Sequence, residues 1–250
     1  MLYPLFHISD IKELPMKLTT VLFDLDGTLL PMDQEVFVKT YLGQLAKFLV
    51  PHGYDPQAVV KAIWAGTEAM MRNTGPATNE EVFWNTFCGI FGEDARKDEP
   101  LFRTFYETKF QEVKSSCGFN PKAAETLIAL KERGLRLVLA TNPLFPAIAT
   151  ESRIRWAGLE PGDFELYTTY ENACRCKPNP DYYRDILEKI GVAPAECLMV
   201  GNDVDEDGAA AKLGMDVFFL TECLINRHNT DLTGRPQGSL DDLLAYIDTL

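Results

Sequence analysis

Four short apolar runs constrain the fold of this chain more than any other feature of its sequence. They cover residues 20–25, 135–140, 196–200 and 216–220, and a weaker fifth run covers residues 165–169. Continuous apolar runs of this length are typical of strands in a sheet that is covered on both faces. Stretches with helical periodicity lie between them, and this alternation predicts an α/β fold with a doubly wound parallel sheet.

Two of the intervening helices are expected over residues 120–134 and 179–191. Each begins with an Asn-Pro pair and ends at a glycine. Asparagine can cap the first N–H groups of a helix, proline fits its first turn, and glycine adopts the left-handed conformation that ends it.

Residues 33–117 differ from the rest of the chain, because they show helical periodicity and many aromatic residues but no convincing strand. We therefore expect an all-helical insertion, or cap domain, with a small apolar core, inside an α/β core domain made of residues 1–32 and 118–250. The helices expected within the insertion cover residues 34–50, 56–71, 79–91 and 99–113.

The first apolar run ends in Asp24-Leu25-Asp26-Gly27-Thr28. Residues two apart on a strand point the same way, so both carboxylates are expected to face one pocket at the edge of the sheet where ligands bind. Two like charges in one pocket need a cation or a shared proton. Hard oxygen ligands indicate Mg²⁺. A strand that simply runs into an Asp-Gly turn is the alternative, which the full five-residue string disfavours.

This string resembles the first motif of the haloacid dehalogenase superfamily, most of whose members are phosphatases on a Rossmann-like core. The second run ends in Thr141-Asn142. The resemblance implies that the Thr141 hydroxyl and the following backbone N–H, that of Asn142, bind a phosphoryl oxygen. Lys177 stands just before a helix start, and the resemblance makes it the cation that balances Asp24 and the transferring phosphoryl group.

The run over residues 196–200 leads into an acidic loop, and the resemblance implies that an acidic pair in this loop holds the metal. Asp203 is expected to be the direct ligand and Asp207 a supporting or water-mediated one. Asn202 stands where the family more often has an aspartate directly after the glycine, so Asp205 remains an alternative ligand.

Together these motifs imply a Mg²⁺-dependent phosphomonoester hydrolase that acts on a small phosphorylated metabolite. Asp24 would be the nucleophile that forms an aspartyl phosphate, and Asp26 the general acid and base. Mg²⁺ would contact Asp24, the backbone carbonyl of Asp26 and Asp203. A sugar phosphomutase or a phosphonate hydrolase of the same superfamily is the alternative, and a phosphate-accepting receiver domain is the alternative from another class.

The insertion falls where one large subclass of the superfamily carries a helical cap of the first, or C1, type. Such a cap would close over the site and select the substrate. Side chains of the insertion that are candidates for substrate contact, although each would also be ordinary on a surface, are Lys47, His52, Arg72 and Asn79.

The formal net charge of −13 argues against nucleic acid and anionic membranes as partners. No apolar run approaches the roughly 18 residues needed to cross a bilayer. Residues 1–15 do not resemble a secretion signal, and the six cysteines are therefore expected to be reduced thiols of a cytoplasmic enzyme. Met16 is a candidate alternative start, with residues 1–15 as a peripheral extension. The sequence does not specify the oligomeric state.

Overall fold

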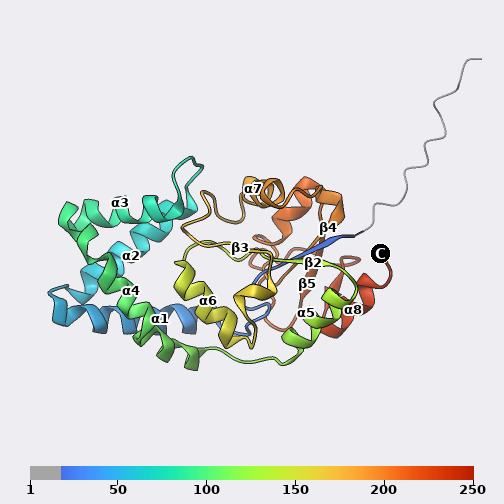
Figure 1. The fold of residues 1–250 in the computed structure, drawn as a ribbon, viewed down its shortest axis with the longest axis horizontal. Coiled ribbons are helices and arrows are strands. Elements are labelled where there is room, and N and C mark those ends of the chain that lie inside the picture. Colours follow the sequence, from blue (N-terminus) through green and yellow to red (C-terminus); the bar gives the residue numbers. More distant parts are fainter. Residues whose placement is uncertain (1–17) are drawn as a thin grey trace, which may run out of the picture.

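The computed structural model describes residues 18–250, so the expectations for residues 1–15 and Met16 lie outside the described residues. The strands are β1 (Thr20–Phe23), β2 (Arg136–Leu139), β3 (Leu166–Tyr167), β4 (Cys197–Gly201), β5 (Asp216–Leu220) and β6 (Gln237–Gly238). They form one sheet in the order β3-β2-β1-β4-β5-β6, and every neighbouring pair is parallel. Figure 1 shows the sheet with helices around it. The predicted α/β class is confirmed.

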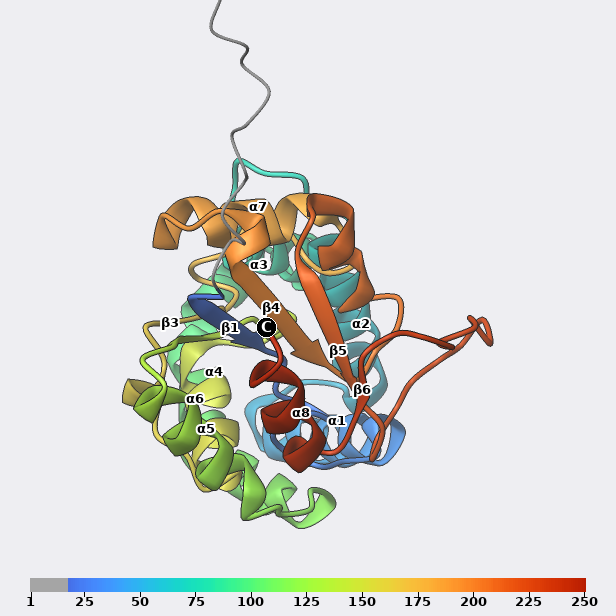
Figure 2. The ribbon, with the colours of Figure 1, turned by 90° about the vertical axis from the view of Figure 1, so that its right-hand side faces the viewer.

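Alternate residues of the strands enter two apolar layers on opposite faces of the sheet. The core helices are α5 (Lys122–Glu132), α6 (Ala147–Trp156), α7 (Pro180–Ile190) and α8 (Leu240–Ile247). Val21 and Phe23 of β1 belong to the cluster that contains α5 and α8, whereas Leu22 packs with α7. Figure 2 shows α5 and α8 on one side of the sheet and α7 on the other.

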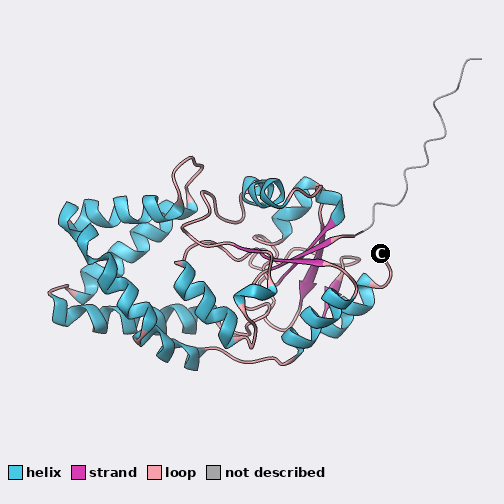
Figure 3. Cartoon of the chain, in the orientation of Figure 1, coloured by secondary structure: helices cyan, strands magenta, loops and turns pink. Residues whose placement is uncertain are grey.

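The insertion is helical throughout and lies beyond one end of the sheet (Figure 3). Its helices are α1 (Gln34–Leu49), α2 (Pro56–Met71), α3 (Asn79–Phe91) and α4 (Glu99–Glu107), joined by the 3₁₀ segments η1 (Val50–His52), η2 (Glu93–Asp98) and η3 (Lys109–Ser116). The prediction of one helix over residues 99–113 was wrong, because the helix ends before Thr108. Thr108 leaves the helical conformation, with φ −120° and ψ −80°, and the chain continues as the 3₁₀ segment η3.

The helix predicted over residues 120–134 also begins later than expected. It starts at Lys122, and no side-chain cap precedes it at Pro121. Asn120 still accepts a hydrogen bond from the Lys122 N–H at 3.0 Å. By contrast, Asn179 caps α7 as predicted, and Gly191 ends it in the left-handed conformation.

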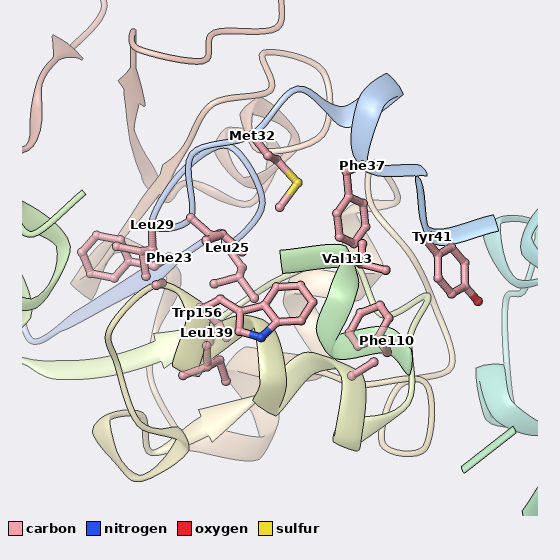
Figure 4. Packing of buried hydrophobic residues seen from close by; sticks show 14 of the residues in the cluster. Phe23, Leu25, Leu29, Met32, Phe37, Tyr41, Phe110, Val113, Leu139 and Trp156 are labelled. Atoms are coloured by element: carbon pink, nitrogen blue, oxygen red, sulfur yellow. The ribbon is translucent and has the colours of Figure 1, made fainter. Parts of the chain in front are cut away.

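The two linkers of the insertion lie side by side, and its apolar residues join those of the core. Met32 pairs with Cys117 in an antiparallel bridge. The rings of Phe110 in η3 and Trp156 in α6 stack with centroids 5.0 Å apart. Figure 4 shows side chains from both parts in one continuous cluster. The insertion therefore shares its apolar core with the sheet, where the sequence predicted a core of its own.

Candidate active site

The sheet order places β1 between β2 and β4, so polar residues at their carboxyl ends meet at one edge. Lys177, in the loop before α7, donates to Asp24 Oδ1 at 2.8 Å and to Asp207 Oδ1 at 2.7 Å. The lysine is only 1% exposed and Asp24 7%. Three segments that are far apart in the sequence thus form one buried ionic cluster.

The charge balance of this cluster keeps Lys177 protonated. Burial by itself would lower the pKa of Lys177, but Asp207 and Asp24 outweigh it and hold that pKa well above its ordinary value. A buried ion needs such partners, because losing its hydration costs several kcal/mol. The two carboxylates therefore fix a permanent positive charge beside Asp24.

Asp24 is also held from the opposite side, through Thr28 and Asn202. The Thr28 hydroxyl lies 3.1 Å from Asp24 Oδ2 and 3.0 Å from Asn202 Oδ1, which are both acceptors for its proton. The amide of Asn202 donates to the carbonyl of Cys223 at 2.7 Å. Gly27 has φ +86°, and a Cβ there would lie 2.3 Å from Asn202 Nδ2. Asn202, the residue that departs from the family pattern, therefore packs directly against Gly27 in the turn.

Asp26 forms an ion pair with Arg153, a residue that the sequence analysis missed. Arg153 lies on α6, its side chain is 1% exposed, and its guanidinium lies over the ring of Phe145 at 4.4 Å. Burial raises the pKa of Asp26 to about 6, although the arginine acts to lower it. Arg153 belongs to no recognisable motif, so only the fold brings it to Asp26.

The acidic loop after β4 is ordered around Asp203. Its Oδ1 accepts from the backbone N–H groups of Asp205 and Glu206, both at 3.0 Å. Its Oδ2 accepts from Arg227. Asp207 Oδ2 in turn accepts from the Asp203 N–H at 2.9 Å. The expected ligands Asp203 and Asp207 are therefore linked to each other, and Asp207 links them to Lys177.

Comparison with known proteins identifies the family. The model of the haloacid dehalogenase-like hydrolases matches residues 18–214. The chain belongs to this family. It is a hydrolase of the phosphatase-like type, as the resemblance of its motifs had implied.

Relatives support the same assignment. The chain is 27% identical over 198 residues to the pyrophosphatase PpaX of Bacillus velezensis, covering 79% of this chain and 81% of that protein. It shares its fold with a HAD phosphatase from Thermococcus onnurineus, with TM-score 0.56, 22% identity and coverage of 92% and 97%. It also shares the fold of a predicted phosphoglycolate phosphatase from Haemophilus somnus, with TM-score 0.56, 20% identity and coverage of 91% and 97%.

The oxygen donors of this hydrolase suit Mg²⁺, but they are engaged with protein cations. Within residues 18–250, no group of three or more His, Cys, Asp or Glu side chains is arranged to hold a metal ion as it stands. Asp26 Oδ1 is buried and has no hydrogen-bond partner among the same residues. Arg227, which holds Asp203, has a side chain that is 49% exposed. The chemistry of the donors fits a hard cation, and the predicted ligand set stays a prediction.

The alternative ligand Asp205 lies at the border of this group. Its carboxylate is 3.6 Å from His228 Nε2, and its side chain is 34% exposed. Its backbone N–H, and not its carboxylate, contacts Asp203.

The end of β2 presents Thr141 and Asn142 at the same edge. The carbonyl of Thr141 accepts from the Thr168 hydroxyl at 2.6 Å and the Tyr182 hydroxyl at 2.8 Å. The Asn142 amide donates to Glu206 Oε2 at 3.1 Å. Burial raises the pKa of Glu206 to about 7. These bonds fix the backbone turn on which the predicted phosphate contacts depend.

One of the four candidate contacts in the insertion reaches the core. Asn79, which is fully buried, donates to the carbonyl of Pro143 at 3.1 Å and to Cys176 Sγ at 3.3 Å. It therefore bridges the loops that carry the predicted phosphate-binding residues. The other three are exposed: Lys47, His52 and Arg72.

No helix of the described chain combines the length and the apolar character that crossing a bilayer requires.

Proposed function

We propose that this hydrolase is a Mg²⁺-dependent phosphomonoesterase that transfers the phosphoryl group of a small metabolite to Asp24 and then hydrolyses the aspartyl phosphate. The observation that carries this proposal is the buried contact of Lys177 with Asp24 and Asp207 at the carboxyl edge of the sheet. An ammonium held there stabilises both the attacking carboxylate and the charge of a transferring phosphoryl group.

In the proposed first step, a carboxylate oxygen of Asp24 attacks phosphorus and the bond from phosphorus to the ester oxygen breaks. Asp26 donates a proton to the leaving alkoxide. In the second step Asp26 takes a proton from water, the water oxygen attacks phosphorus, and inorganic phosphate leaves with Asp24 restored. Lys177, the Thr141 hydroxyl and the backbone N–H of Asn142 would bind the phosphoryl oxygens in both steps.

Asp24, the backbone carbonyl of Asp26 and Asp203 would hold Mg²⁺, with Asp207 in support. The ion would supply positive charge against the phosphoryl oxygens. The insertion, residues 33–117, would act as the cap over residues 1–32 and 118–250. A cytoplasmic location and the absence of nucleic-acid or membrane partners remain part of this proposal.

Substitution of the nucleophile tests this function directly. Asp24→Asn is expected to lower kcat for an aryl phosphate by roughly 10³-fold or more, because an amide cannot form the acyl phosphate. Asp207 remains as a partner for Lys177, so the variant should fold, which circular dichroism would verify. Asp94→Asn is a matched control, since the Asp94 side chain is 89% exposed. Retained hydrolysis by the Asp24 variant would refute the proposed nucleophile.

Removal of the metal tests the cofactor separately. A chelator is expected to abolish steady-state phosphate release, and excess Mg²⁺ is expected to restore it. A receiver-type domain would instead accept phosphate once without sustained turnover. Full activity after dialysis against the chelator would contradict the proposed Mg²⁺ dependence.

A further inference from the structure

A cavity of about 340 Å³ lies between the insertion and the core. Its walls come from the four helices of the insertion, from the loop after β2, and from single residues that follow β3, β4 and β5. An apolar cavity of about 150 Å³ is enough to hold benzene, so this one has room for a larger ring or a chain of several methylenes. Most of the lining is aromatic or aliphatic, including Tyr41, Ile63, Trp64, Phe83, Trp84 and Phe145.

The lining offers almost no charge that could bind an anion. Among the described residues that line it, only Glu206 and Arg227 are charged, and none is a lysine or a histidine. Arg227 is paired with Asp203, and Glu206 is an acid. A leaving group that carries a phosphate or carboxylate would therefore meet one carboxyl group and a single arginine that already has a carboxylate partner, and would recover little of the hydration it loses.

The cavity borders residues that contact the candidate active site, among them neighbours of the proposed proton donor. Asn142, which lines the cavity, directly follows Thr141. Phe145, another lining residue, supports the guanidinium of Arg153, which pairs with Asp26. Since Asp26 is the group that would protonate the leaving oxygen, the substituent on that oxygen belongs on this side.

Two buried polar atoms of the lining residues lack a hydrogen-bond partner within residues 18–250. They are Trp84 Nε1 and Asn142 Oδ1. Such atoms are costly to leave unsatisfied. The cavity therefore tolerates an isolated polar group on its occupant, although its walls are mainly apolar.

We infer that this hydrolase selects phosphate monoesters whose leaving group is uncharged and largely apolar. The inference rests on the proposed function and names the substrate class of that same site. This substrate class differs from pyrophosphate, the anion named in the relatives called pyrophosphatase PpaX.

A series of alkyl phosphates tests the inference, because their leaving alcohols differ in apolar surface but little in acidity. With Mg²⁺ present, kcat/KM is expected to rise about fourfold for each added methylene from methyl to hexyl phosphate, until the cavity is filled. Pyrophosphate is expected to be a poorer substrate than hexyl phosphate. A flat series, or a preference for pyrophosphate, overturns the inference while leaving the proposed phosphatase function in place. Failure to hydrolyse every ester would instead overturn the proposed function.

A charge placed in the cavity provides a second test. Met71, at the end of α2, lines the cavity and is 48% exposed, so Met71→Lys should fold. This variant is expected to lower the ratio of kcat/KM for hexyl over methyl phosphate by at least about fivefold. Ile90→Lys is the matched control, because Ile90 is 51% exposed and lies outside the lining. It should keep the wild-type ratio, and an equal effect of both variants would overturn the inference.

Discussion

The buried guanidinium of Arg153 determines how Asp26 is held. Its contacts with Asp26 and Phe145 come from an otherwise ordinary helix, and the side chain is almost inaccessible to water. Arg153 does not contact Asp24 or Lys177 in the hydrogen bonds that the structure shows. Its proposed role is therefore to position Asp26, and not to bind the phosphoryl group itself.

Removal of Arg153 is expected to cost both stability and turnover. Arg153→Met should lower the free energy of unfolding by about 2 kcal/mol, because it leaves the partly buried Asp26 carboxylate, with its buried Oδ1, without its partner. It should lower kcat about tenfold with little change in KM, since Asp26 would lose its orientation. Urea unfolding and steady-state kinetics would measure these effects.

Arg153→Lys provides the control for this prediction. It keeps the charge but loses the planar fork, so partial recovery of both quantities is expected. A methionine variant as stable and as active as the wild type would show that the ion pair has no role in the site.

Among the elements, α3 connects the insertion to the loop that carries Lys177. The Thr78 hydroxyl accepts from the Glu81 N–H, and the Glu81 carboxylate accepts from the Thr78 N–H at 2.8 Å. The backbone N–H of Asn79 donates to the carbonyl of Ala173 at 2.8 Å. The first turn of α3 is thus capped by its own side chains. The same turn is also hydrogen-bonded to the core loop that leads to Lys177.

Loss of the cap should be measurable as a change in stability. Thr78→Ala is expected to lower the free energy of unfolding by about 1 kcal/mol, because the first N–H groups of α3 lose an acceptor. Thr86→Ala on the same helix is the control. Thr86 lies within the helix and bonds the carbonyl of Val82, so alanine there should be neutral or slightly stabilising. If both variants had the same stability in chemical denaturation, the capping assignment would be wrong.

The sequence predicts an element well when its signal is local. The apolar run at residues 216–220 coincides with β5, and the Asn-Pro pair at residues 179–180 marks the start of α7. The two-residue strand β6 carries no apolar pattern, and α6 begins after Pro146 with its first N–H bonded to the distant Glu171 carboxylate, with no cap from a neighbouring residue. Tertiary contacts alone stabilise these last two elements, so their sequences do not reveal them.

The candidate site follows the same rule. Asp24 and Lys177 belong to short strings with a recognisable spacing, and the fold brings them within hydrogen-bonding distance. The contacts of Arg153 with Asp26 and of Asn202 with Thr28 join residues that are more than 120 positions apart. No local sequence pattern indicates such pairs, because the residues meet only once the chain has folded.

At the scale of the whole molecule, the insertion and the sheet are held together by one apolar cluster. Tyr41 of α1 packs edge-on against Phe145 of the core at 5.2 Å, and Phe110 packs against both Phe145 and Trp156. Phe110 is completely buried. Burial of this junction couples the two parts energetically, because neither can unfold without exposing the apolar surface of the other.

This coupling predicts a single unfolding transition for the whole chain. Tryptophan fluorescence and far-ultraviolet circular dichroism should give the same urea midpoint, because Trp84 and Trp156 report on the two parts of one cluster. Phe110→Ala should lower that common midpoint, with a loss of about 3–5 kcal/mol from the free energy of unfolding. If the insertion were energetically independent, the two signals would separate and the variant would shift only one of them. An equal shift of both curves on substitution would show that the junction stabilises the insertion and the sheet together.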